Sequence, residues 1–501
     1  MPVADEAVNQ RLKSLESHLQ RENPALLEVV ASFRELDRMA YRLGLLERDE
    51  SYATRIPWWP LISVLGTFSS GKSTFINHYL GMRLQSTGNQ AVDDRFTVLC
   101  HSREENVNVL PGLALDADPR FPFYQISDEI EKVAGGEGAR IDSYLQLKTC
   151  PAEALKGKIL IDSPGFDADA QRTATLRLTE HIIDLSDLVL VFFDARHPEP
   201  GAMQDTLEHL VARSLSRPDA SKFLYVLNQI DTTAREDNPE EVFGAWQRAL
   251  AQKGLTAGRF YTIYNPEASV PIEDANLRQR FENKRDADLC AIHERIAQVE
   301  VERSYRIVGS LEKQAKRIEN RLIPLLRQAL QRWKKQTLIA EGVIFAALAI
   351  TVLTLLFRYS PGEGWLPTWP SLLNPGNHPI VGSIGLMVIA VLLLGLHFRL
   401  RNWRARGVLR WLEGQAQDEN EAKQLRGGFM RSTRYWRSLF SREPAGWWRG
   451  TRRTLHKLVG DTDRYVQRLN DRFANPSGKA SASPADASSE TSEASAQVDN
   501  K

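Results

Sequence analysis

The sequence predicts an α/β fold: a doubly wound, mainly parallel sheet, flanked by helical stalk segments and followed by a two-helix transmembrane hairpin. Three observations predict this architecture. Apolar runs of strand length alternate with helix-length segments between residues 57 and 274. A glycine-rich loop joins the first of these runs to a helical segment. Two later apolar runs of about 20 residues have the length that a helix needs to cross a bilayer.

Residues 1–56 are expected to form two N-terminal helices. Their apolar residues recur at helical spacing on both sides of Pro24. Proline lacks an amide hydrogen and disfavours the interior of a helix, so Pro24 is expected to separate the two helices.

Residues 57–274 are expected to form the sheet domain. Its apolar runs are near-continuous, as in parallel strands that helices cover on both faces. Helices are expected between the strands, at residues 171–186 and 240–252. The strands are expected within residues 60–66, 158–165, 187–194, 223–231 and 260–264.

Residues 275–336 are the predicted helical stalk, a long amphipathic helix with a kink at Pro324. Between Val301 and Trp333, apolar residues recur every three or four positions with charged residues between them. The apolar face packs either on the sheet domain or on a second subunit, because periodicity does not name the partner.

Residues 337–399 hold the predicted transmembrane hairpin, with its apolar runs at Leu338–Phe357 and Ile380–Phe398. The connecting residues 358–379 hold one basic residue, so the positive-inside rule places both termini in the cytoplasm. The alternatives are a buried helical hairpin in a soluble core and a shallow hairpin that does not fully cross. The basic residues outside the two runs are Arg332, Lys334, Lys335, Arg399, Arg401, Arg404 and Arg406.

Residues 400–473 are rich in arginine and tryptophan. This region is either a solvated helical domain with a basic face or a helical surface that lies on anionic headgroups with its aromatic residues inserted. The adjacent hairpin favours the second interpretation, so no nucleic-acid partner is expected. Residues 474–501 contain no large apolar side chain other than valine and are expected to be a disordered tail.

The composition argues against several other classes of protein. The net charge is +1, so no global field attracts nucleic acid or membranes. The three cysteines, Cys100, Cys150 and Cys290, are far apart, which argues against a disulfide framework or a zinc site and fits a reducing compartment. The N-terminal residues show no apolar run of the secretory-signal type.

The first chemical motif is GTFSSGKST at Gly66–Thr74, which matches GxxxxGK[ST] between a strand and a helix. It predicts an α/β P-loop domain in which backbone amides surround the phosphates. Lys72 is expected to reach the β- and γ-phosphates, and the Ser73 hydroxyl to ligate Mg²⁺. The candidate nucleotide-binding residues here are Gly66, Ser70, Gly71, Lys72, Ser73 and Thr74.

Two further motifs end predicted strands. In DSPG, Asp162 is expected to hold Mg²⁺ through water and the Gly165 amide to meet the γ-phosphate. In NQID, Asp231 is expected to accept hydrogen bonds from guanine and Asn228 to brace the P-loop. Gln229 stands where lysine is usual, which weakens the prediction of guanine. Taken alone, NQID would be better explained as a turn after a strand, and the other two motifs reverse that preference.

The three motifs together resemble those of the dynamin superfamily, and most of all its EHD ATPases. The likeness covers roughly Pro60–Pro266 and includes Asp93–His101, Leu110–Phe123 and Phe192–His197. It implies a G domain that dimerises across the nucleotide, helical segments that assemble, and remodelling of membranes. By position, Ser69 matches the P-loop serine that helps to place the attacking water in dynamins.

The sequence departs from the EHD pattern in two ways. Val92-Asp93 stands where the family has a threonine pair that ligates Mg²⁺, so Thr97 or Thr87 is the candidate replacement, or turnover is slow. EHD proteins bind membranes peripherally, whereas a paired span looks more like mitofusins and some bacterial dynamin-like proteins. With no sign of a mitochondrial presequence, a bacterial inner membrane is favoured.

The sequence therefore predicts a membrane-anchored, Mg²⁺-dependent nucleoside triphosphatase that prefers GTP, with ATP next. The candidate catalytic residues are Lys72, Ser69, Asp162 and Gly165, and the candidate metal ligands are Ser73, Asp162 and Thr97. Its expected partners are the lipid bilayer and further copies of itself. The alternative is a membrane-bound nucleotide switch or scaffold that hydrolyses slowly and recruits a partner. A transporter is a weaker alternative, because two spans without internal acid–base groups offer little pathway.

Overall fold

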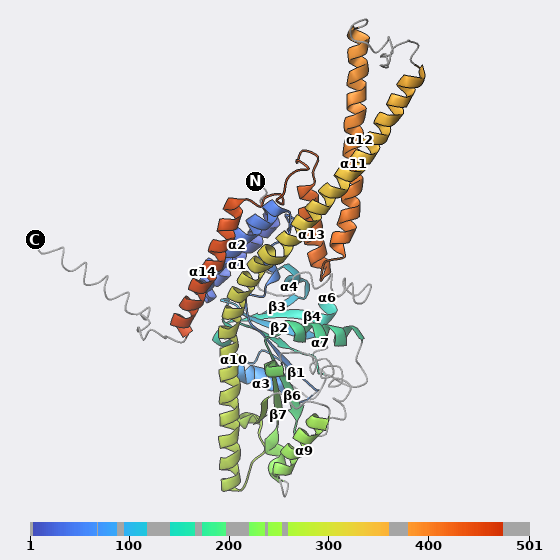
Figure 1. Ribbon diagram of the computed structural model, residues 1–501. Helices are drawn as coiled ribbons and strands as arrows, with labels where there is room; N and C mark the ends of the chain where they lie inside the picture. The colour runs from blue at the N-terminus through green and yellow to red at the C-terminus, as the bar shows by residue number, and fades with distance from the viewer. Residues whose placement is uncertain are drawn as a thin grey trace, which may run out of the picture. The chain divides into compact units, whose positions relative to one another are not determined.

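The structure is a computed structural model that describes residues 4–67, 69–87, 95–117, 141–165, 173–196, 220–235, 239–252, 259–359 and 379–473 (Figure 1). The chain divides into two compact units. The sheet unit comprises Asn9–Val30, Ala53–Gly309 and Arg464–Lys501, and the hairpin unit comprises Met1–Val8, Ala31–Tyr52 and Ser310–Asp463.

The helices range from four residues in α6 to 43 residues in α10. They are α1 (Glu6–Glu22), α2 (Leu27–Leu43), α3 (Lys72–Leu80), α4 (Leu113–Ala117), α6 (Ile141–Tyr144), α7 (Thr173–Leu185), α9 (Pro239–Gln252), α10 (Ala275–Arg317), α11 (Ile323–Tyr359), α12 (Pro379–Glu413), α13 (Glu419–Ser432) and α14 (Arg449–Phe473).

Within the described ranges, the sheet has eight strands in the order β3-β4-β2-β5-β1-β6-β7-β8. The pairs β5–β1, β1–β6, β6–β7 and β7–β8 are parallel, as is β2–β4, whereas β2–β5 and β3–β4 are antiparallel. The strands are β1 (Leu61–Gly66), β2 (Phe96–His101), β3 (Asn108–Pro111), β4 (Leu145–Cys150), β5 (Ile159–Asp162), β6 (Leu188–Asp194), β7 (Phe223–Asn228) and β8 (Arg259–Ile263).

Helices cover both faces of this sheet, as the near-continuous apolar strands predict. On one face, Phe75 and Ile76 of α3 and Ile296 of α10 pack with Val64 and Leu160. The residues that α7 and α9 contribute to the other face include Ile183, Trp246 and Leu250. The predicted class, a doubly wound and mainly parallel α/β sheet, is confirmed.

An ion pair fastens α10 to the sheet. Asp187 lies just before β6, is 3% exposed, and accepts from the Leu61 amide at the start of β1. The Arg303 guanidinium of α10 donates to the same carboxylate oxygen, with its Nε 3.0 Å away, and Arg306 contacts the other oxygen at 2.8 Å. Helix α10 is therefore bound to the sheet at the amino-terminal ends of β1 and β6.

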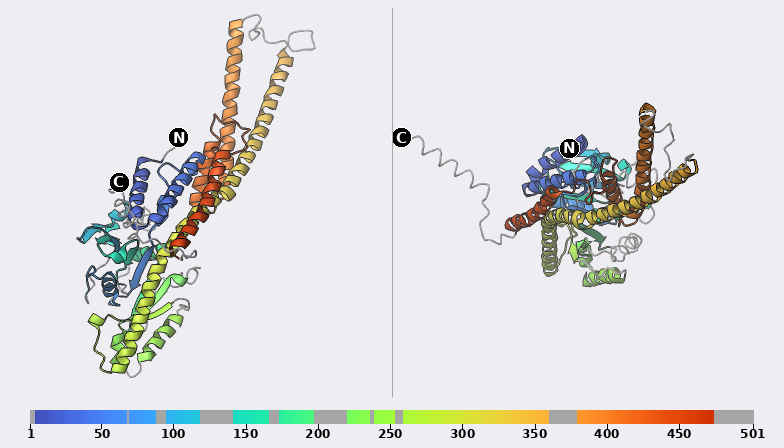
Figure 2. Two further views of the ribbon diagram at one scale, coloured as in Figure 1. Left: turned by 90° about the vertical axis from the view of Figure 1, so that its left-hand side faces the viewer. Right: turned by 45° about the horizontal axis from the view of Figure 1, so that its top comes forward.

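In the hairpin unit, α11 and α12 run side by side (Figure 2) and α13 packs against both. Trp333 of α11 is 2% exposed, and its indole donates to the Arg401 carbonyl of α12 at 3.1 Å. A Cβ on Gly427 of α13 would lie 2.3 Å from the Gly44 carbonyl oxygen, so this approach of α13 to the end of α2 requires glycine.

Among the residues that the structure describes, two helices, α11 and α12, are long and apolar enough to cross a membrane. Their apolar side chains are exposed, with Val343 at 65%, Ile350 at 62%, Met387 at 69% and Leu392 at 67%. The described part of these runs therefore does not form the buried core that the soluble alternative requires.

Two features differ from the expectation. Strands β2, β3 and β4 fall in segments that the sequence left unassigned. The interruption of the stalk is a π-helical turn at Ile318–Leu322, which ends just before Pro324 rather than at it. Proline has no amide hydrogen to donate, and a widened turn before it accommodates the missing bond.

Candidate functional site

Three loops meet at one edge of the sheet. Strands β1, β5 and β7 point the same way through their parallel partners, and they end at Gly66, Asp162 and Asn228. Each of these ends opens one of the motifs, so the carboxyl edge gathers the P-loop, DSPG and NQID. In open α/β sheets, ligands bind at this edge.

The P-loop turns tightly into α3. Gly71 has φ +83°, and a Cβ there would lie 2.1 Å from Nδ2 of Asn228. Asn228 in turn donates from Nδ2 to the Ser70 carbonyl at 2.9 Å, and Gln229 donates from Nε2 to the Ser69 carbonyl at 2.7 Å. The NQID loop is thereby hydrogen-bonded to the P-loop, although residues 70 and 228 are far apart in sequence.

Lys72 is the first residue of α3 and is 7% exposed. Its ammonium donates to the carbonyls of Gly66 and Thr67, each at 2.9 Å. Burial lowers the pKa of Lys72 to about 8, and the charge of Asp162 opposes that shift. A cation at the start of a helix, enclosed by its own loop, suits an anionic ligand that supplies the missing negative charge.

Asp162 ends β5 and belongs to a buried polar chain. Gln85, which is 4% exposed, donates from Nε2 to the Asp162 carboxylate at 2.6 Å. The Lys148 ammonium on β4 donates to Gln85 Oε1 at 2.7 Å. These two hydrogen bonds fix the orientation of the Gln85 amide, because its nitrogen donates to Asp162 and its oxygen accepts from Lys148. One Asp162 oxygen is thereby directed toward Gln85.

Thr97 lies on β2 directly opposite Asp162 in the antiparallel pair, so their side chains share a face. Thr97 is 1% exposed, and its hydroxyl accepts from Nε2 of Gln146 at 2.7 Å. Of the other switch candidates, Thr87 is exposed, and Val92 and Asp93 lie outside the described residues.

Asp231 lies in the short helix η6 (Ile230–Arg235), one turn after β7. It is 4% exposed and accepts from the Val270 amide at 2.7 Å. Burial raises the pKa of its carboxyl, while that hydrogen bond and the charge of Arg196 lower it. The Val270 contact fixes the orientation of the Asp231 carboxylate.

The residues present fit a magnesium–nucleotide pair. Mg²⁺ is typically held by one or two protein oxygens together with phosphate oxygens and water, rather than by a cage of side chains. Ser73 and Asp162 offer one hydroxyl and one carboxylate, and Gly165 follows in the same loop. Within the described ranges, no three acidic, histidine or cysteine side chains gather as a metal cage.

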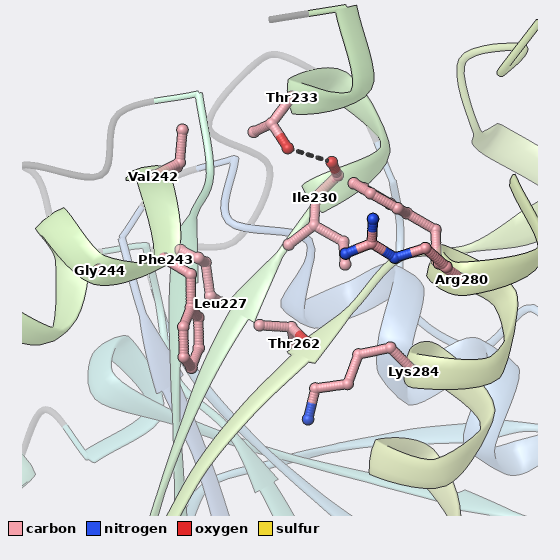
Figure 3. A pocket seen from close by; sticks show the side chains of 10 residues that line it. Leu227, Ile230, Thr233, Val242, Phe243, Gly244, Thr262, Arg280 and Lys284 are labelled. Atoms are coloured by element: carbon pink, nitrogen blue, oxygen red, sulfur yellow. Dashed lines mark hydrogen bonds between the residues drawn. The ribbon is translucent and has the colours of Figure 1, made fainter. Parts of the chain in front are cut away.

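A separate cavity of about 530 Å³ lies beside η6, between α9, α10 and the ends of β7 and β8 (Figure 3). It contains no P-loop residue and is lined largely by apolar side chains, with Arg280 and Lys284 of α10 on one side. It is not the phosphate site, and its other lining residues are Leu227, Ile230, Thr233, Val242, Phe243, Gly244, Phe281 and Thr262.

The sequence pointed to neither Gln85 nor Lys148. Gln146 and Lys148 alternate with leucines in LQLKTC at Leu145–Cys150. That alternation is a strand signal with one polar face, and it is the clue that was available. Nothing local marks Gln85, because its partners come from two distant strands.

Residues 62–230 match the model of the dynamin family. Over this domain the chain is similar to the dynamin family. EH domain-containing protein 2 of Mus musculus is 23% identical over 365 residues, which cover 68% of this chain and 62% of that protein. EH domain-containing protein 1 of Homo sapiens is 27% identical over 185 residues, covering 34% of this chain and 31% of that protein. The resemblance to dynamins and EHD proteins is confirmed.

The alignment thus spans less than two thirds of the length of these relatives. Among solved structures, a chain described as part of an oligomerised bacterial dynamin pair, which senses and tethers membranes, aligns with 14% identity and a TM-score of 0.31. That alignment covers 97% of this chain and 78% of the other.

Proposed function

We propose that this dynamin-superfamily chain is a membrane-anchored, Mg²⁺-dependent GTPase that couples hydrolysis to self-assembly and membrane remodelling. The observation that carries the proposal is the convergence of the P-loop, DSPG and NQID loops at one sheet edge, with Asn228 hydrogen-bonded to the P-loop. The family match supports the same reading.

In the proposed reaction, water attacks the γ-phosphate in line, and the chain contributes positioning and charge rather than covalent chemistry. Lys72 turns from the carbonyls of Gly66 and Thr67 to the β- and γ-oxygens and stabilises the charge that develops there. The Gly165 amide meets the γ-phosphate, and Ser69 helps to place the water. A bound Mg²⁺, held through Ser73 and Asp162, would neutralise charge on the phosphate oxygens.

The preference for GTP rests on Asp231. Its carboxylate can accept from the ring NH and the exocyclic amine of guanine, whereas adenine offers no such pair of donors on that edge. Gln229 replaces the usual lysine and is hydrogen-bonded to Ser69, so the cover that it gives the base is weaker. ATP is therefore the second candidate substrate.

Membrane anchoring rests on α11 and α12, whose exposed apolar side chains need a nonpolar environment. The basic residues that flank the pair support a topology with both chain ends on one, cytoplasmic side. Self-association with nucleotide, followed by deformation or tethering of the bilayer, is the proposed use of hydrolysis.

One observation favours the second candidate, a slow switch that recruits a partner. The Thr97 hydroxyl, the candidate replacement for the family's Mg²⁺-ligating threonine, is already hydrogen-bonded to Gln146 inside the sheet. If no other hydroxyl reaches the metal, hydrolysis is slow while nucleotide binding is preserved.

The deciding experiment measures affinity and turnover of the detergent-solubilised full chain with GTP and ATP in parallel. Lys72→Ala is the inactivating variant, and Lys156→Ala, whose side chain is 49% exposed, is the matched control. The proposal expects GTP-selective turnover that Lys72→Ala abolishes and Lys156→Ala leaves intact. Tight binding without turnover would support the switch instead, and binding of neither nucleotide would overturn both.

A further inference from the structure

The connection between α13 and α14, residues 433–448, exposes an unusual set of aromatic side chains. Tyr435 is 70% exposed, Trp436 60%, Phe440 64% and Trp448 57%. Contiguous exposed apolar groups of this size mark a surface that binds something. We call residues 433–448 the aromatic connection.

The aromatic connection has a fixed conformation. Leu439, Ala445 and Trp447 are buried and hold it to the hairpin unit, while Tyr435 and Trp436 point outward. The Ala445 amide donates to the Ser432 hydroxyl at 2.9 Å. The exposed rings are thus presented by a packed segment.

Arg401 of α12 fixes the position of the aromatic connection along the hairpin, relative to the end of the apolar run. Its guanidinium is buried and donates to the carbonyls of Arg434 at 3.1 Å and Arg437 at 2.6 Å. Arg401 lies three residues beyond Phe398, the end of the apolar run, which is about 4.5 Å along a helix.

Lys334 of α11 independently indicates the same position of the connection relative to the apolar runs. Its ammonium lies 4.7 Å from the centre of the Phe440 ring. Lys334 precedes the other apolar run, which begins at Leu338, by about 6 Å of helix. The headgroup layer on each side of a bilayer is roughly 5–8 Å thick. Both helices therefore place the connection at the depth of the headgroups if the two runs span.

The charge around these rings is positive. The aromatic connection has three arginines and one acid, and that acid, Glu443, pairs with Arg327 at 2.9 Å. The pKa of nearby Arg431 is lowered, first by burial and then by the charges of Arg434 and Arg437. Such a site gains from anions that the chain does not supply.

We propose that the aromatic connection is an interfacial anchor that inserts Tyr435, Trp436 and Phe440 among the headgroups of a leaflet containing anionic phospholipid. Tryptophan and tyrosine favour this layer because one end of each ring system is apolar and the other polar. The inference rests on the proposed crossing by α11 and α12. It assigns membrane contact to a loop held at the base of the hairpin rather than to a basic helix lying on the surface.

The test places an environment-sensitive NBD label at single cysteines in the reconstituted full chain. Cys100 and Cys150 are buried and Cys290 is exposed, so Cys290→Ser gives the background. The labelled variants are Trp436→Cys and Phe440→Cys. The matched control is Asn420→Cys, an exposed position on α13 beyond the far end of α12. Vesicles contain phosphatidylcholine alone or with phosphatidylglycerol.

Labels at positions 436 and 440 are expected to emit at shorter wavelength and to be quenched several-fold more by shallow brominated lipid than the label at 420. Phosphatidylglycerol is expected to increase that quenching, and Arg434→Gln with Arg437→Gln to remove the increase. Equal quenching by aqueous iodide at 420, 436 and 440 would overturn the proposal, as would quenching that is indifferent to anionic lipid.

Alkaline extraction of the same vesicles separates this proposal from the membrane span. Protein that resists extraction but keeps positions 436 and 440 in water would leave the span intact and refute the interfacial anchor. Protein released by alkali would refute the span itself. If added RNA, rather than lipid, shifts the emission at 436, the surface binds nucleic acid and the proposal fails.

Discussion

At the scale of single residues, Lys72 predicts how nucleotide affinity depends on pH. Its pKa is about 8 because it is buried, and phosphate oxygens beside the ammonium would raise that pKa. Binding then takes up a proton whenever the pH exceeds the lower pKa. Affinity should be flat below pH 8 and fall by up to about tenfold per pH unit above it.

Titration calorimetry between pH 7 and 9.5, in two buffers of different ionisation enthalpy, measures both the affinity and the proton uptake. Lys72→Arg should lose the dependence, because guanidinium stays charged throughout. Lys156→Ala should retain it. Affinity that does not change up to pH 9.5 in the wild-type chain would contradict this role of Lys72.

The contact of Gln85 with Asp162 predicts that Gln85 affects the Mg²⁺ requirement of turnover. Its amide donates to Asp162 at 2.6 Å and holds that carboxylate in place, so Gln85→Leu should raise the Mg²⁺ concentration needed for half-maximal turnover several-fold. Nucleotide affinity measured in EDTA should change little, because Gln85 contacts no P-loop residue in these hydrogen bonds. Gln279→Leu, at an exposed position of α10, is the matched control. Equal Mg²⁺ requirements in the wild-type chain and Gln85→Leu would exclude this function.

The same two residues show what the sequence could and could not predict about the site. Lys72, Asp162 and Asp231 belong to contiguous motifs, because each loop must present several groups to one ligand. Gln85 acts through Lys148 and Asp162, which lie on different strands, so only the folded sheet brings them together. The position of Thr97 opposite Asp162 likewise depends on a strand register that no local pattern specifies.

At the scale of elements, the buried strands were predictable because covering helices demand continuous apolar sequence. Strand β4 was missed although Gln146 and Lys148 alternate with leucines, because these polar residues break the continuous apolar run that marked the other strands. They form the polar network beside Asp162. Strand β3 lies at the edge, pairs with one neighbour and exposes Val109, so it resembles a loop in composition. Strand β4, whose polar residues join the network beside Asp162, therefore lacks the continuous apolar pattern of the central strands.

The link between α10 and the sheet predicts a stability effect. Asp187→Ala leaves the buried Arg303 guanidinium without its carboxylate and should destabilise the sheet unit by about 3 kcal/mol. The midpoint of thermal unfolding should fall by roughly 6 °C or more for a domain of this size. Arg306→Ala removes a contact from a side chain that is 43% exposed and should cost less than about 1 kcal/mol.

Differential scanning fluorimetry of the full chain measures both variants. Equal midpoints for Asp187→Ala and the wild-type chain would show that α10 is held by its apolar face alone. A large loss in Arg306→Ala with little in Asp187→Ala would reverse the assignment of the anchoring pair.

At the scale of the whole molecule, α10 passes from the sheet unit into the hairpin unit, and its α11 continuation carries the first apolar run. A continuous stretch of chain, largely helical, therefore joins the sheet unit to the proposed membrane segment. In the proposed function, this connection transmits either the assembly of several copies or a conformational change within one molecule.

Turnover at different protein-to-lipid ratios distinguishes the two. If hydrolysis requires domains to meet across the nucleotide, activity per molecule should rise in proportion to surface density until dimers saturate, because the encounter is second order. A switch that acts alone should give the same activity per molecule at every density. Lys72→Ala supplies the background rate in both cases. A flat response, with nucleotide bound and the chain resistant to alkaline extraction, would retain the anchored nucleotide site but exclude assembly as the step that drives hydrolysis.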